Sequence, residues 1–172
     1  VVAATLNVGF QVGALVPPSD PCRVLSVPPT REAPRLTGPE DITSRVRFLR
    51  QPDSPVSVTA IDFSRTRLMA SAGSFDWTGT FTLEIENVSA RPLRNMRAVV
   101  FVRDSQLSGI GSGVRFDEVL VPGARVRLPG SASGQGSGLQ SDVTLDVLIE
   151  SVRWERCEFR PSQSIPLTET AK

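Results

Sequence analysis

The sequence contains no histidine and no tyrosine among its 172 residues. Histidine is the commonest general base, the usual activator of a nucleophile and the usual nitrogen ligand for metals. Two carboxylates could still support hydrolysis, but the acidic candidates are better explained as solvated positions on strands or loops: Asp117, Glu118, Asp142 and Asp146. We therefore predict a protein that is not an enzyme and that has no cofactor and no metal site.

Lysine is almost absent, since Lys172 is the single one and all the other basic residues are arginine. The guanidinium group is a planar, bidentate donor suited to carboxylate or phosphate, although a GC-rich coding bias explains the arginine content as well. The net charge is only +1, which argues against a general electrostatic attraction to nucleic acid. We expect no nucleic-acid partner.

Cysteine is scarce, with Cys22 and Cys157 at opposite ends of the chain. In an exported protein two such residues predict one disulfide, which would stabilise the fold by about 4 to 5 kcal/mol on the chain-entropy model. The alternative is a pair of unrelated buried thiols in a cytosolic protein. Cys22 lacks the small apolar residues that precede a bacterial lipoprotein cysteine, so no lipid anchor is expected there.

Charge is missing from residues 1–19, and two interpretations of this segment remain open. As a strand, large apolar residues alternate with small or polar ones at a period of two. As a helix, two glycines at G-x-x-x-G spacing suit close packing in a membrane. We predict contact with a membrane or a partner protein, or a strand in the domain's own sheet. The residues expected to make the contact are Leu6, Val8, Gly9, Phe10, Val12 and Gly13.

Proline is dense from Pro17 to Pro34, which favours an extended, stiff segment without ladder donors. We divide the chain into an uncharged N-terminal segment (1–19), a proline-rich spacer (20–36), a β-sandwich domain with a short leading helix (37–160) and a polar tail (161–172). The spacer would hold the domain away from whatever the N-terminus contacts.

A Thr-x-x-Glu capping pattern at Thr37 and apolar residues at helical spacing, Ile42, Val46 and Leu49, predict the leading helix over about 39–50. After Pro52 the period of apolar residues changes to two. Residues from Val56 alternate until the phase slips near position 63, which indicates a strand with a bulge.

Residues 79–104 give the clearest fold signal, two strands joined by an irregular connection. Apolar and polar residues alternate from Phe81 to Ile85, and residues 96–102 are apolar on both faces, which suits an interior strand. Further strands are predicted at 114–121, at 125–128 and from Val143 to about 159, with a phase shift at Ser151. The glycine- and serine-rich residues 129–141 are expected to form a flexible hairpin loop.

Short strands, regular turns and little helix predict a mainly β protein, an antiparallel β-sandwich. The central stretch resembles the small immunoglobulin-like domains of bacterial envelope proteins, in particular the FxLYD type. The residues that carry the resemblance are Gly79, Phe81, Asn87-Val88-Ser89, Leu93 and Val99-Val100-Phe101-Val102-Arg103-Asp104, with Arg103 standing where an aromatic residue is usual. The resemblance implies an extracytoplasmic, non-catalytic role, often beside a membrane anchor.

The leading functional hypothesis is an accessory or structural subunit on the extracytoplasmic side of a membrane. Its partners would be proteins of a larger, membrane-bound complex, and it would brace that complex through its N-terminal segment and its sandwich. The alternative is a module that binds carbohydrate or another envelope ligand. Sugar sites commonly present exposed aromatic rings, and Trp77, Trp154 and most phenylalanines are needed for the core.

Overall fold

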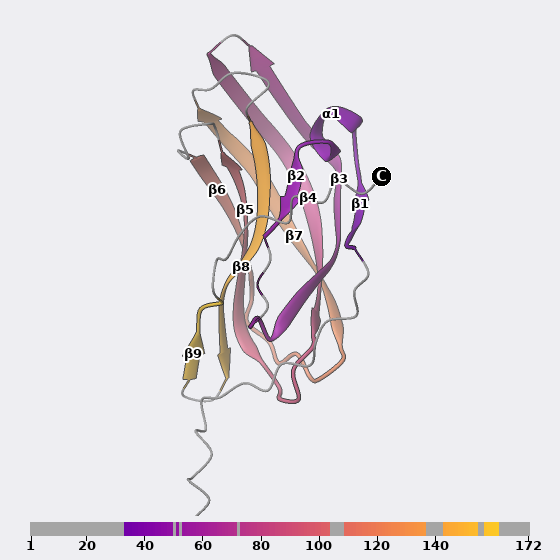
Figure 1. The fold of residues 1–172 in the computed structure, drawn as a ribbon, viewed down its shortest axis with the longest axis vertical. Coiled ribbons are helices and arrows are strands. Elements are labelled where there is room, and N and C mark those ends of the chain that lie inside the picture. Colours follow the sequence, from indigo (N-terminus) through magenta and orange to yellow (C-terminus); the bar gives the residue numbers. More distant parts are fainter. Residues whose placement is uncertain are drawn as a thin grey trace, which may run out of the picture.

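The computed structural model describes residues 33–49, 51, 53–71, 73–103, 109–136, 143–154 and 157–161, which form two β-sheets packed face to face (Figure 1). The first sheet has the order β1-β3-β4-β7, with β1 (Arg35–Thr37), β3 (Val56–Ser71), β4 (Ser74–Asn87) and β7 (Arg125–Gly136). The second has the order β2-β8-β5-β6, with β2 (Val46–Phe48), β8 (Thr144–Trp154), β5 (Arg94–Arg103) and β6 (Gly109–Phe116). A last strand, β9 (Cys157–Phe159), pairs with the end of β8.

The predicted β-sandwich is confirmed, and its core lies between the two sheets. Phe81, Leu83 and Ile85 of β4 point inward and are almost fully buried, as are the alternating residues Leu145 and Val147 of β8. Trp77, Trp154 and Phe63 are the largest buried side chains, and the Trp77 and Phe63 rings both contact Phe81. Alternate residues of each strand fill this layer. The outer face of the first sheet is mainly polar, whereas the outer face of the second also carries the buried apolar residues Val99 and Leu148.

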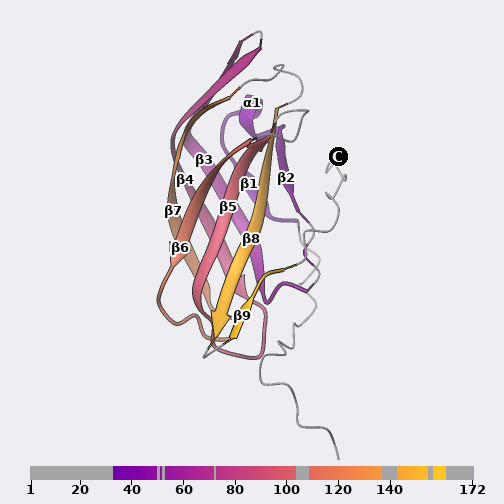
Figure 2. The ribbon, with the colours of Figure 1, turned by 90° about the vertical axis from the view of Figure 1, so that its left-hand side faces the viewer.

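The chain crosses between the sheets in an immunoglobulin-like order. β3 and β4 form a hairpin in the first sheet, and β5 and β6 follow as a pair in the second. β7 then returns to the first sheet beside β4, and β8 returns to the second beside β5, as Figure 2 shows. The strands of residues 79–104 therefore lie in different sheets, and their connection bridges the two layers.

Most pairs are antiparallel, as predicted, but both sheets are mixed. β1 runs parallel to β3, with Arg35 opposite Ala60, and β2 runs parallel to β8, with Val46 opposite Leu145. Among the described residues the first strand of the sandwich begins at Arg35, two residues inside the predicted spacer. These parallel pairs arise because one short segment contributes a strand to each sheet in succession.

The helix predicted over residues 39–50 is confirmed only for its first turn, and its predicted length is wrong. The helix α1 (Glu40–Thr43) makes only one turn, buries Ile42 and has no side-chain cap at its N-terminus. The rest of the predicted range extends into β2, where the apolar Val46 and Phe48 pack against the core. Hydrogen bonds with the open edge of β8 outweigh the helical spacing of the apolar residues.

The flexible loop predicted for residues 129–141 is wrong over its first part, because β7 continues through Gly136. Pro129 pairs with Thr82, and Gly136 pairs with Phe75. A Cβ atom at Gly130 would overlap the Phe81 ring, so this glycine makes room for the aromatic side chain of the neighbouring strand. The glycines are thus packing partners within a strand. Residues 137–142 lie outside the described residues.

Two predicted irregularities are confirmed. The register of β3 against β4 shifts between Asp62 and Arg65, where the apolar phase slips. The register of β8 against β5 shifts next to Ser151, after which Val152 and Trp154 are the buried residues. The strand predicted at 114–121 is displaced to Gly109–Phe116, since residues 117–124 form the connection to β7.

Candidate functional site

Most residues predicted to make functional contacts lie outside the described residues. This holds for Leu6, Val8, Gly9, Phe10, Val12, Gly13 and Cys22, and their roles stay predictions. Cys157 begins β9, is 8% exposed, and is not a free thiol. The predicted strand or helix over residues 1–19 and the polar tail beyond residue 161 likewise fall in the part of the chain that is not described.

The edge of β8 is closed by pieces from both ends of the described chain. β5 pairs with one side of β8, while β2 covers the start of the other side and β9 covers its end. Gln51 fills the gap between them: its Nε2 donates to the Ile149 carbonyl at 2.7 Å, and its Oε1 accepts from the Ile149 N–H at 2.8 Å. The side-chain amide therefore imitates a strand residue.

A buried carboxylate next to this edge is held by two arginines. Asp146 is 2% exposed and accepts a bidentate pair from Arg47, with Nε–Oδ1 at 2.8 Å and Nη2–Oδ2 at 3.1 Å. Arg103 adds Nε–Oδ2 at 3.1 Å and stacks over the Phe101 ring. The three charged residues come from β8, β2 and β5, so they fasten three strands. Asp146 is therefore a structural residue.

The outer face of the first sheet repeats this arrangement. Glu84 of β4 is 8% exposed and contacts Arg127 of β7 at 3.0 Å and Arg35 of β1 at 3.4 Å. The Thr59 hydroxyl donates to Glu84 Oε1 at 2.9 Å. The hydrogen bonds from Arg127 and Thr59 lower the pKa of Glu84 below its usual value of 4.5. This cluster fixes the four strands of the sheet.

Asn87, which opens an Asn-x-Ser glycosylation pattern, is fully buried. Its Nδ2 donates to the carbonyls of Arg91 and Leu120, and its Oδ1 accepts from the N–H and hydroxyl of Ser89. This amide organises the turn between the sheets and is inaccessible to modification.

A polar area on the outer face of β3, β4 and β7 was missed by the sequence reasoning. Two rows of exposed side chains cross the three strands, Arg65-Thr80-Ser131 and Arg67-Thr78-Ser133. We call these six residues the arginine–hydroxyl face. The signals that could have identified it are the Arg-x-Arg spacing in β3 and the alternating hydroxyl residues in β4 and β7.

A half-open hollow of about 740 Å³ lies at the row Arg65-Thr80-Ser131 of this face. Its lining includes Asp62, Ser64, Arg65, Thr80 and Ser131. Ser64 donates to Asp62 Oδ1 from its hydroxyl at 2.5 Å and from its N–H at 2.8 Å. These two bonds lower the pKa of Asp62. The hollow therefore presents an ionised acceptor, a guanidinium donor and several hydroxyl groups.

The remaining candidate residues do not come together in one site. Asp117 and Glu118 are exposed in the connection after β6, and Asp142 lies outside the described residues. Trp77 and Trp154 are buried, and the exposed large apolar residues among those described are Leu36, Met69, Val119 and Val121, none of them aromatic. In the described ranges no group of histidine, cysteine or acidic side chains is arranged to hold a metal ion. None of the helical structure described here is long and apolar enough to cross a bilayer.

No protein-family model matches the sequence, and no curated protein matches it. A solved structure that is similar in part is a β-glucuronidase from glycoside hydrolase family 2, with a TM-score of 0.28 and 15% sequence identity. The match covers 51% of this chain and 11% of that chain, so the chain spans about a tenth of the length of the enzyme. A similarity this weak carries no argument about function.

Proposed function

We propose that the protein is a non-catalytic accessory subunit on the extracytoplasmic side of a membrane. Its N-terminal segment docks onto a partner protein or the membrane, and its sandwich braces the larger assembly. The proposal rests on the uncharged segment of residues 1–19, the proline-rich spacer and the way in which the following residues join the sandwich.

The observation that carries the proposal is the double attachment of the segment that follows the spacer. β1 hydrogen-bonds to β3 in the first sheet, and after α1 the same segment hydrogen-bonds to β8 in the second sheet as β2. Ile42 of α1 is buried between these attachments, and Arg35 and Arg47 each form an ion pair with a central strand. A contact made by the N-terminal segment is thereby transmitted to both layers.

A disulfide between Cys22 and Cys157 would add a third attachment. Cys157 lies in β9 at the end of the β8 edge, so a bond to Cys22 would tie the spacer to the edge that β2 already occupies. Intact-mass measurement with and without reduction tests the bond. A mass increase of about two hydrogens on reduction supports it, and two alkylatable thiols in the unreduced protein contradict it.

The docking role is tested by deleting residues 1–16 from the full chain in its native host. We expect the deleted protein to fold but to leave the membrane fraction and to lose its co-purifying proteins. The matched control removes residues 163–172, which should leave both properties intact. Unchanged fractionation and co-purification after the N-terminal deletion would contradict the proposal.

A further inference from the structure

The arginine–hydroxyl face has a regular construction that the bracing role does not explain. Its two rows lie on adjacent positions of one sheet face, with a basic residue on β3 and a hydroxyl residue on both β4 and β7. Successive rows on one face of a strand are about 6.8 Å apart. The inward-facing neighbours Thr66, Leu68 and Trp77 are buried, so the core fixes the positions of the exposed side chains.

The two arginines of this face are exposed and form no salt bridge with a described carboxylate. Eight other arginines in the described ranges form salt bridges: Arg35, Arg47, Arg97, Arg103, Arg125, Arg127, Arg153 and Arg160. Within the described residues Arg65 and Arg67 form no salt bridge and are exposed, although the charge of Arg65 acts on nearby Asp62 and helps to lower its pKa. An arginine without a protein carboxylate offers its bidentate donor fork to a carboxylate from outside.

Carboxylates border the two rows and limit what the face can bind. Asp62 lies next to the row of Arg65, and Asp76 lies next to the row of Arg67. The net charge of these two carboxylates and two arginines is therefore about zero. A dense polyphosphate such as nucleic acid needs an excess of positive charge, which this face lacks. The exposed large apolar residue here is Met69 alone among those described, which gives little area for insertion into a lipid surface.

The chemistry fits a polymer that alternates carboxylates with hydroxyl groups. Arg65 and Arg67 would pair with two carboxylates of the polymer, while Thr78, Thr80, Ser131 and Ser133 exchange hydrogen bonds with its hydroxyls. The ionised Asp62 would accept further hydrogen bonds from hydroxyls inside the hollow. Asp62 also repels a polymer whose carboxylates are too closely spaced.

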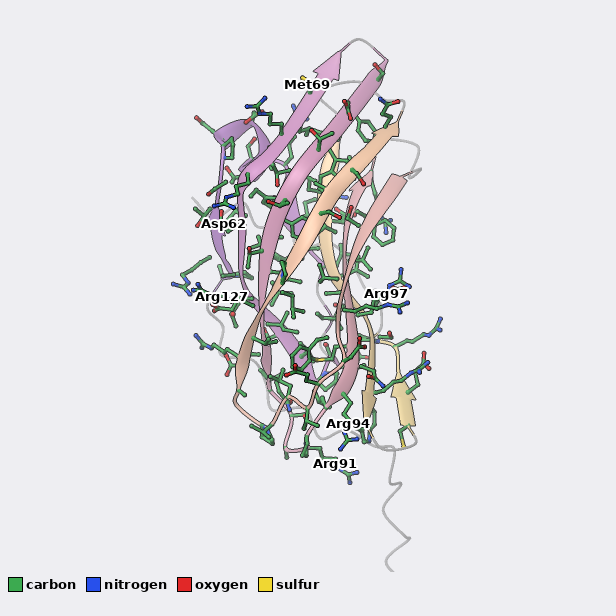
Figure 3. All side chains as sticks on the ribbon, turned by 180° about the vertical axis from the view of Figure 1, so that it is seen from behind. Asp62, Met69, Arg91, Arg94, Arg97 and Arg127 are labelled. Atoms are coloured by element: carbon green, nitrogen blue, oxygen red, sulfur yellow. The ribbon has the colours of Figure 1, made fainter. Side chains whose placement is uncertain are left out.

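We propose that the arginine–hydroxyl face binds an acidic polysaccharide containing uronic acid. The site lies on β3 where this strand extends toward the hairpin that projects beyond the rest of the sandwich (Figure 1), and Figure 3 shows Asp62 and Met69 along it. Arg91 and Arg94 lie at the opposite end of the molecule. Binding at this face leaves the N-terminal docking role unchanged and adds a second contact to the cell envelope.

The test is calorimetric titration of the full chain with oligogalacturonate. We expect binding that weakens with added salt, and a loss of affinity of about tenfold or more in the double variant R65Q/R67Q. The matched control is R94Q/R115Q, which removes the same charge from two other exposed arginines without salt bridges. It should bind within about twofold of the wild type, because remote exposed charges are screened.

A second variant, T80V/S131A, removes two hydroxyls and keeps the charge. It should bind several-fold more weakly while its thermal unfolding stays unchanged, and neutral dextran should not bind to any of the proteins. Three results would overturn the proposal: no binding of oligogalacturonate to the wild type, equal losses in both arginine variants, or tighter binding of duplex DNA or anionic vesicles that depends on Arg65 and Arg67.

Discussion

Among single residues, Gly79 occupies a position in β4 that strains any side chain. Its φ is +125°, and a Cβ atom there would overlap the carbonyl oxygen of Arg65 on the neighbouring strand β3. We predict that Gly79→Ala lowers the free energy of unfolding by about 2 to 4 kcal/mol, measured by urea denaturation. Gly123→Ala is the control, because Gly123 also has a positive φ but has open space around it. Equal losses in the two variants would contradict this explanation.

A substitution of Asp146 tests whether this buried carboxylate stabilises the second sheet. Asp146→Asn leaves Arg47 and Arg103 without their shared partner, and we expect a loss of about 2 to 3 kcal/mol in the free energy of unfolding because both arginines are partly exposed. Glu158→Gln is the control, since its arginines Arg153 and Arg160 are exposed and such pairs contribute little. A stability of Asp146→Asn equal to that of the wild type would show that the cluster is dispensable.

At the scale of elements, the side chain of Gln51 bonds to the edge of β8 between the parts that pair with β2 and with β9. We predict that Gln51→Ala costs about 1 to 3 kcal/mol and accelerates amide hydrogen exchange at Ile149, whose N–H loses its acceptor. The Leu145 amide on the same edge bonds to the Arg45 carbonyl and should keep its protection. Equal acceleration at both amides would indicate a general loosening of the sheet.

The same elements show how far sequence patterns lead. Alternation predicted β4 and β8 because each has one face in the core, and it also placed the bulge of β3 and the phase shift of β8. It failed for β2 and for residues 129–136 of β7, whose extended conformation depends on the neighbouring strands. Val46 and Phe48 extend because β8 has an open edge, and Gly130 lies in a strand because the Phe81 ring covers it.

The candidate site was less predictable than the fold for a related reason. Arg65 and Arg67 are recognisable as a pair in the sequence, but Thr80 and Ser131 join them only through the register of three strands. The sequence likewise offered Asp146 as a candidate acid, and only the positions of Arg47 and Arg103 in space show its structural role. A periodic sequence pattern does not show which distant segments come into contact.

For the whole molecule, both outer faces are held by carboxylates that arginines from other strands contact. The pKa of Glu84 is lowered by Arg127 and Thr59, and the pKa of Asp62 by Ser64. A carboxyl group with a lowered pKa in the folded state stabilises the fold fully above its unfolded value and loses that contribution as the pH falls through the folded value. Acid should therefore destabilise the sandwich below about pH 4.5 and change its stability little above about pH 5.5.

The variant Glu84→Gln shows how much one carboxylate contributes to the loss of stability in acid. We predict that the variant is less stable than the wild type by about 1 to 2 kcal/mol at neutral pH. The difference should shrink as the pH falls from about 4.5 through the lowered pKa of folded Glu84, below which both proteins carry a neutral side chain there. Urea denaturation at several pH values measures it. Glu118→Gln, at an exposed residue without a salt bridge, should differ from the wild type by a small and constant amount. A gap for Glu84→Gln that does not depend on pH would mean that its packing, and not its charge, stabilises the first sheet.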